Sequence, residues 1–168
     1  EYLGLRKPRK NLHLFLSILL MLGALPVLEA LQNLISQIDF GAKVKEAQAV
    51  NKSMYSAFLN LPTFGAFARA FVVLAIIPAV GEELFFRGIL LRFARQKSRA
   101  ITIPIIFTAV IFAYTHANLY GLLSIMLAGV LLAVIYYLTG SLWCSILAHM
   151  CFNGLQVVLS YLSNSSTA

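Results

Sequence analysis

The chain has 168 residues, of which 60% are hydrophobic and 11% are charged, and its mean hydropathy is +0.85. An ordinary soluble domain has about 25% charged residues, so this composition excludes the soluble classes and predicts a membrane protein. The net charge of +7 would suggest a nucleic-acid partner in a soluble protein, but here the basic residues flank apolar segments. We therefore assign the charge to membrane topology and expect no nucleic-acid partner.

Four or five segments are long enough to cross a bilayer, which takes roughly 20 mostly apolar residues. The five candidates cover about residues 12–34, 67–93, 101–116, 119–138 and 142–162. Each predicts a helix, because an open sheet leaves backbone groups unpaired in lipid and the sequence has no alternating strand pattern. Pro26 predicts a kink in the first helix. The predicted fold class is therefore all-α, a polytopic transmembrane bundle of about five helices.

The connection between the first two spans, residues 36–64, is more polar than its neighbours. In it, Met54, Phe58 and Leu61 are spaced by four and three, which predicts an amphipathic helix lying at the membrane interface. We expect residues 1–64 to form a unit of basic flank, first membrane helix and extracytoplasmic connection, and residues 65–168 to form the core. The sequence opens at Glu1 without a signal-peptide pattern, so we expect it to be part of a longer chain.

Two basic clusters border the first two spans. They consist of Arg6, Lys7, Arg9 and Lys10 before the first span and Arg92, Arg95, Lys97 and Arg99 after the second. If the two helices are antiparallel, both clusters lie on one side of the membrane. The positive-inside rule then predicts that this side is cytoplasmic and that the connection 36–64 faces outward.

The stretch VGEELFFRGILL, residues 80–91, places three ionisable side chains inside an apolar span. Each would cost about 2.5–3.5 kcal/mol at the centre of a bilayer, so partners are required. Glu83 and Arg87 are four apart with the acid first, which favours an ion pair that holds the site in shape. Glu82 points about 100° away and is the better candidate for chemistry. Pro78, four residues earlier, predicts a kink that makes room beside Glu82.

Two further motifs bring polar residues into the later spans. In FAYTH, Phe112 and His116 are four apart, and in HMCFN, His149 and Asn153 are four apart, so each pair shares one face of its helix. Only three histidines occur in the chain, and His13 stands beside the basic flank, where we assign it no catalytic role. Packing is the ordinary role of a lone membrane histidine, but these two share a bundle with Glu82.

A carboxylate, two imidazoles and a carboxamide in a low dielectric suit the hydrolysis of an amide. In this interpretation Glu82 is the general base, His116 holds the water or helps to deprotonate it, and His149 and Asn153 donate to the oxyanion. A zinc site on Glu82, His116 and His149 is the alternative, because one carboxylate and two imidazoles with an open position also suit a catalytic metal. No HExxH motif is present, so the sequence alone leaves both mechanisms open.

The three motifs resemble, in order, the EExxxR, FxxxH and HxxxN motifs of the CAAX-protease and bacteriocin-processing family of intramembrane proteases. The resemblance covers about residues 67–162 and is carried by EELFFR (82–87), FAYTH (112–116) and HMCFN (149–153). It implies a glutamate-dependent intramembrane endopeptidase, and family members are also described as metalloproteases. The predicted site residues are Glu82, Glu83, Arg87, His116, His149 and Asn153.

The resemblance also implies a setting for the protein. Its substrate would be a peptide or a lipidated, CAAX-type protein in the membrane, and its location a bacterial inner membrane. The family often has six to eight helices, whereas this sequence offers about five. We also weigh a non-catalytic immunity or scaffold protein of the same fold, and a transporter, for which the sequence lacks the expected repeats. Counting rise along straight helices leaves one conflict, because His116 falls near the opposite end of its span from Glu82 and His149.

Overall fold

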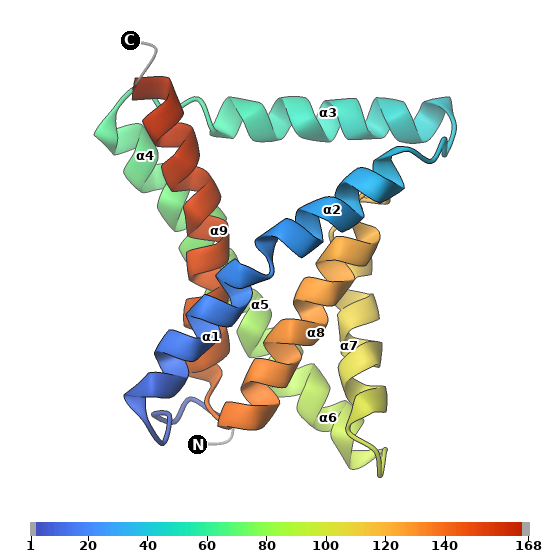
Figure 1. The fold of residues 1–168 in the computed structure, drawn as a ribbon, viewed down its shortest axis with the longest axis vertical. Coiled ribbons are helices and arrows are strands. Elements are labelled where there is room, and N and C mark those ends of the chain that lie inside the picture. Colours follow the sequence, from blue (N-terminus) through green and yellow to red (C-terminus); the bar gives the residue numbers. More distant parts are fainter. Residues whose placement is uncertain (1–2, 166–168) are drawn as a thin grey trace.

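The computed structural model describes residues 3–165, with side chains described as far as residue 163. Every regular element in this range is helical (Figure 1), which confirms the predicted all-α class. The elements are α1 (Asn11–Gly23), α2 (Leu25–Ser36), α3 (Ala42–Phe58), α4 (Phe64–Phe71), the π-helical η1 (Val72–Ile76), α5 (Ile77–Glu83), the π-helical η2 (Leu84–Leu90), α6 (Leu91–Gln96), α7 (Thr102–Thr115), α8 (Leu122–Thr139) and α9 (Leu142–Ser165).

Four of the described helices are long and apolar enough to cross a membrane. They are Asn11–Ser36, Phe64–Gln96, Leu122–Thr139 and Leu142–Ser163. The remaining predicted segment, 101–116, forms α7, which has 14 residues and is therefore about 21 Å long. The apolar core of a bilayer is about 30 Å thick, so α7 ends short of the distance that the other helices cover.

The first membrane segment is divided in two, as Pro26 predicts. Helix α1 ends at Gly23, and Pro26 occupies the first turn of α2, where its missing N–H costs no helical hydrogen bond. Figure 1 shows α2 leaving the line of α1 at an angle, toward the end of the molecule where α3 lies. The change of direction carries α2 over α8, against which it packs.

Helix α3 lies crosswise over one end of the bundle (Figure 1) and has no buried residue. Met54 and Phe58 are exposed on it, as the amphipathic pattern predicts, but Leu61 lies beyond its end and is buried with Ala70 and Val157. The predicted stripe was therefore wrong at Leu61, because the helix stops at Phe58 and the chain turns into the core. Whether α3 rests on the membrane interface remains a prediction.

The helix that carries the acidic motif runs without a break from Phe64 to Gln96. It is α-helical except for two π-helical segments, η1 and η2. The Thr63 hydroxyl accepts a hydrogen bond from the Ala66 N–H and caps its start. The π-helical segment η1 directly precedes the turn that contains Pro78, and η2 begins directly after Glu83. Single π-helical turns inside α-helices are rare and are frequent at functional sites.

Residues of the two basic clusters lie together at one end of the molecule, as predicted for antiparallel first and second spans. Arg6 Nε donates to the Gly140 carbonyl oxygen at 2.7 Å, at the junction of α8 and α9. Arg6, Arg92 and Arg95 line one cavity of about 500 Å³ at this junction. We call this the basic end. At the opposite end, the Gly41 N–H and Lys45 lower the pKa of Asp39 in the loop before α3.

Cysteine labelling tests the predicted orientation of these two ends. In a background of Cys144→Ala and Cys151→Ala, we expect Lys43→Cys to react in intact cells with a membrane-impermeant maleimide. Ser98→Cys, beside the basic end, should react only after permeabilisation, because the positive-inside rule places it in the cytoplasm. Labelling in the reverse order would show that the chain is inserted the other way.

Candidate active site

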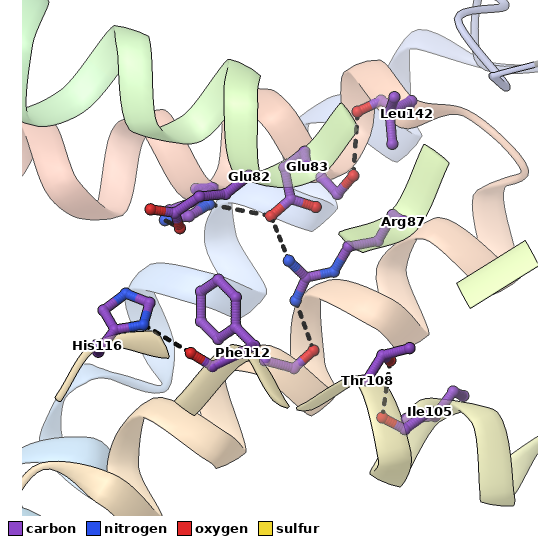
Figure 2. A network of polar contacts seen from close by, with 11 residues as sticks. Glu82, Glu83, Arg87, Ile105, Thr108, Phe112, His116 and Leu142 are labelled. Atoms are coloured by element: carbon purple, nitrogen blue, oxygen red, sulfur yellow. Dashed lines mark hydrogen bonds and ion pairs between the residues drawn. The ribbon is translucent and has the colours of Figure 1, made fainter. Parts of the chain in front are cut away.

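A buried ion pair lies at the centre of the site. Glu83 ends α5 and is 0% exposed, and Arg87 lies one turn later in η2 and is 2% exposed. Arg87 Nη1 donates to Glu83 Oε1 at 2.7 Å (Figure 2). The ion pair predicted from the spacing of four is therefore present, and neither charge faces lipid alone.

Arg87 also joins this helix to α7 and α8. Its Nη2 donates to the Gly129 carbonyl oxygen of α8 at 2.7 Å, and its guanidinium carbon lies 4.9 Å from the centre of the Phe112 ring of α7 (Figure 2). Gly129 keeps α7 and α8 close, because a Cβ there would stand 3.3 Å from the Ala109 backbone. The guanidinium therefore has a carboxylate, a carbonyl and an aromatic face as partners.

His149 of α9 binds the same carboxylate oxygen as Arg87. Its Nδ1 lies 3.0 Å from Glu83 Oε1, and because a carboxylate only accepts, Nδ1–H is the donor. This contact orients the ring so that Nε2 lies 3.9 Å from Glu82 Oε2. The sequence does not predict this contact, because it joins residues 66 positions apart and depends on how α9 packs against α5.

Glu82 stands beside this network without joining it. Its side chain is 30% exposed, and among the described residues its buried Oε2 has no hydrogen-bond partner. The 3.9 Å approach to His149 is longer than a hydrogen bond. Glu83 Oε2 likewise has no described partner, but Glu83 Oε1 binds both Arg87 and His149, and the Glu83 side chain is 0% exposed. Of the two neighbouring acids, Glu82 is therefore the one with an accessible carboxylate.

His116 follows α7 directly, and its tautomer is set by its own helix. His116 Nδ1 lies 2.7 Å from the Phe112 carbonyl oxygen (Figure 2), and because a carbonyl accepts, Nδ1 carries the hydrogen. In a neutral ring, Nε2 is then left as an acceptor. The Phe112 ring centre lies 4.6 Å from that of His116 and 6.1 Å from that of His149, so Phe112 contacts both imidazoles.

A cavity of about 540 Å³ connects these groups to α2. His116, His149 and Asn153 line it from α7 and α9, and polar residues of α2 line the facing wall. Glu82 is not one of the lining residues, and its carboxylate lies next to the cavity at the Nε2 side of His149. The cavity therefore brings together the FAYTH and HMCFN motifs. The acidic motif is connected to them through the contacts of Glu82 and Glu83 with His149.

The structure brings His116 close to the other motifs, although counting along straight helices placed it near the opposite end of its span. His116 lies one turn beyond Phe112, which contacts both Arg87 and His149. The predicted site residues thus come together although three separate helices supply them.

The side chains do not fit the zinc alternative. Within the part of the chain that the structure describes, no group of three or more His, Cys, Asp or Glu side chains is placed to hold a metal ion. Glu82 and His149 approach each other, but His116 contacts the Phe112 carbonyl with one nitrogen and reaches the group only across the cavity. We therefore derive no step through a metal.

The cavity wall on α2 was missed from the sequence. Glu29, Gln32 and Asn33 line it, and their spacing of three and four places them on one helical face. That spacing inside an otherwise apolar segment could have indicated a polar face. The apolar composition of residues 12–34 predicts a membrane span, but it does not predict that the polar positions of this span face a cavity.

Comparison with known proteins supplies the identity. A family model described as "Type II CAAX prenyl endopeptidase Rce1-like" matches residues 64–155, which is more than half of the chain. The chain belongs to this family. The match confirms the resemblance inferred from the three motifs, all of which lie inside it. No curated protein and no solved structure matches the chain.

Membership in the Rce1-like family supports a CAAX-type protease within the membrane, and the four long apolar helices agree with an integral membrane protein. The matched region extends from α4 into α9 and holds the whole Glu83, Arg87 and His149 network. Helices α1, α2 and α3 lie outside the matched Rce1-like region, so the wall that α2 adds to the cavity is not part of what the family model describes.

Removing one partner of the buried pair should destabilise the protein strongly. Arg87→Ala leaves Glu83 buried without its cation, and such a loss costs about 3–5 kcal/mol, which corresponds to a fall in Tm of roughly 6–20 °C for a chain of this size. Thermal unfolding in detergent measures it. Arg99→Ala, which removes an exposed arginine, is the control, and equal Tm values for the two variants would contradict the assigned role of Arg87.

Proposed function

We propose that the chain is an intramembrane endopeptidase in which Glu82 activates water for attack on a peptide bond of a membrane-associated substrate. The observation that carries this proposal is the partly exposed Glu82 carboxylate, which has an oxygen without a described partner 3.9 Å from His149, a residue that lines one cavity with His116 and Asn153. A general base must be reached by water, and the Glu82 side chain is 30% exposed whereas that of Glu83 is 0% exposed.

In the proposed reaction, Glu82 takes a proton from water, and the water oxygen attacks the carbonyl carbon of the substrate. The Nε2 acceptor of His116 helps to hold the water. The carbonyl becomes a tetrahedral oxyanion, which Asn153 stabilises with its carboxamide N–H, and His149 adds a second donor when both ring nitrogens carry protons. The C–N bond then breaks, and Glu82 returns the proton to the departing amine.

Glu83 and Arg87 act in this proposal as positioning residues. Their pair fixes the carboxylate oxygen that binds His149 Nδ1, and so fixes the direction of Nε2. In many active sites, a carboxylate that accepts from one ring nitrogen of a histidine orients the other ring nitrogen in the same way. By the description of its family, a prenylated CAAX-type protein is the first substrate to test, and we extend the proposal to unprenylated membrane peptides.

Replacing Glu82 should abolish cleavage while leaving the fold intact. In proteoliposomes that contain a prenylated CAAX peptide, its unprenylated form or a bacteriocin-type leader peptide, we expect Glu82→Gln to lower the rate about 10²- to 10⁴-fold, as loss of a general base does. Products are identified by mass spectrometry. Glu46→Gln, an equal change of charge on the exposed face of α3, should retain the wild-type rate.

Identical product profiles for folded wild type and Glu82→Gln would contradict the peptidase and favour a non-catalytic immunity or scaffold protein. The comparison of prenylated and unprenylated peptides separates two substrate classes in the same experiment. Cleavage of only the prenylated form would assign the lipid as part of the substrate, and equal cleavage would assign the peptide alone.

Chelation distinguishes the two mechanisms that the sequence leaves open. Because the donors are not gathered as a metal site, we expect incubation with 1,10-phenanthroline followed by desalting to leave the rate of cleavage within about twofold. A known zinc protease treated in parallel verifies that the chelator is active. Loss of cleavage that returns on addition of zinc would overturn the metal-free mechanism.

A further inference from the structure

The catalytic cavity has a second polar wall that the proposed mechanism does not use. Glu29, Gln32 and Asn33 project from one face of α2 into the same cavity that His116, His149 and Asn153 line. Leu25 and Leu28 line it earlier on α2, so the wall changes from apolar to polar along the helix. On α9 the wall likewise continues past Asn153 to Gln156, whose Oε1 accepts from Tyr55 Oη at 3.0 Å.

A carboxylate at position 29 requires an explanation, because it lies within a helix long and apolar enough to cross a membrane. Glu29 is exposed, and it has no hydrogen bond or ion pair with any residue that the structure describes. Among the described lining residues it is the single carboxylate, and none is Lys or Arg. Ionisable residues in such segments face water-filled cavities and mark binding sites for partners of complementary chemistry.

We propose that the polar face of α2 is the substrate-selecting wall of the cavity and that Glu29 binds a cationic group of the peptide, a Lys or Arg side chain or a free amine. This inference rests on the proposed peptidase function. Gln32 and Asn33 each offer a donor and an acceptor, which suit the backbone of an extended peptide. Helix α2 lies outside the matched family region, so the family model does not describe this wall.

The position of the wall agrees with this role. Figure 1 shows α2 extending toward the end of the molecule where α3 lies, whereas the junction of α8 and α9 lies at the other end. Arg6 binds Gly140 at that junction. None of the arginines that line the cavity at the basic end also lines the catalytic cavity. A cation brought by the substrate therefore meets no competing arginine on the described cavity wall. The negative wall therefore attracts a basic peptide, in contrast to the strongly positive basic end.

The test begins with a peptide library whose cleavage products are identified by mass spectrometry, with wild type, Glu29→Gln and the control Glu46→Gln. Wild type and Glu46→Gln should favour Lys or Arg at one fixed distance from the cleaved bond, and Glu29→Gln should not. For a peptide with Lys at that position, kcat/KM should fall about tenfold or more in Glu29→Gln, as expected for loss of a charged hydrogen bond. For the same peptide with Met there, it should change less than twofold.

Charge reversal makes the result specific to electrostatics. Glu29→Lys should prefer the peptide with Glu at the selected position over the peptide with Lys. An equal loss on the Lys and Met peptides, or the same loss in Glu46→Gln, would overturn the assignment of Glu29.

Binding separates this inference from the proposed function. Equilibrium binding of the Lys and Met peptides is compared between Glu82→Gln and Glu82→Gln/Glu29→Gln in detergent micelles. If wild type cleaves nothing but binding still prefers Lys and depends on Glu29, the peptidase proposal fails and the cationic site stands. Binding that is the same for both peptides and both variants overturns the site whatever the outcome of cleavage.

Discussion

The rest of the site depends on the buried contact between Glu83 and Arg87. Each charge would be costly in an apolar interior, and removing either partner leaves the other uncompensated. The pair is compensated because Arg87 also reaches the Gly129 carbonyl oxygen and the Phe112 ring, and Glu83 also accepts from His149. These contacts join the helix of the acidic motif to α7, α8 and α9, so the interaction that offsets the cost of burial also fixes the relative positions of the helices that carry the other motifs.

The two adjacent acids divide their tasks because neighbouring residues on a helix point about 100° apart. Glu83 is fully buried and binds Arg87 and His149 through one oxygen, whereas the Glu82 side chain is 30% exposed and makes no hydrogen bond to the described residues. The π-helical segment η2 begins at the next residue and contains Arg87, which contacts Gly129 and Phe112. A change in winding is costly in a helix interior and persists where several contacts determine it, as they do here.

The sequence predicts what nearby residues determine and misses what helix packing determines. The Glu83 to Arg87 pair follows from a spacing of four, and the break near Pro26 follows from a missing N–H, so both could be inferred without a structure. The bond from His149 to Glu83 joins residues 66 positions apart, and no local pattern specifies it. The prediction for Leu61 was wrong for a related reason. Its spacing from Phe58 fits a helix, but the helix ends at Phe58, and core packing determines where Leu61 lies. The polar face of α2 was present in the sequence, yet its meaning depends on the helix lying against the cavity.

The short α7 connects the architecture to the need for water. At 14 residues, or about 21 Å, it ends short of the bilayer thickness, and the chain leaves helical geometry from His116 to Gly121. Ala117 adopts a positive φ of 48°, and the Asn118 side chain accepts from the Gly121 N–H to close the turn. Non-helical backbone within a membrane is tolerated where it is buried in protein or lines a water-filled cavity. His116, at the start of this turn, lines the cavity with His149 and Asn153. The end of α7 therefore places His116 on the same cavity as His149, and the turn that follows is the non-helical backbone closest to it along the chain.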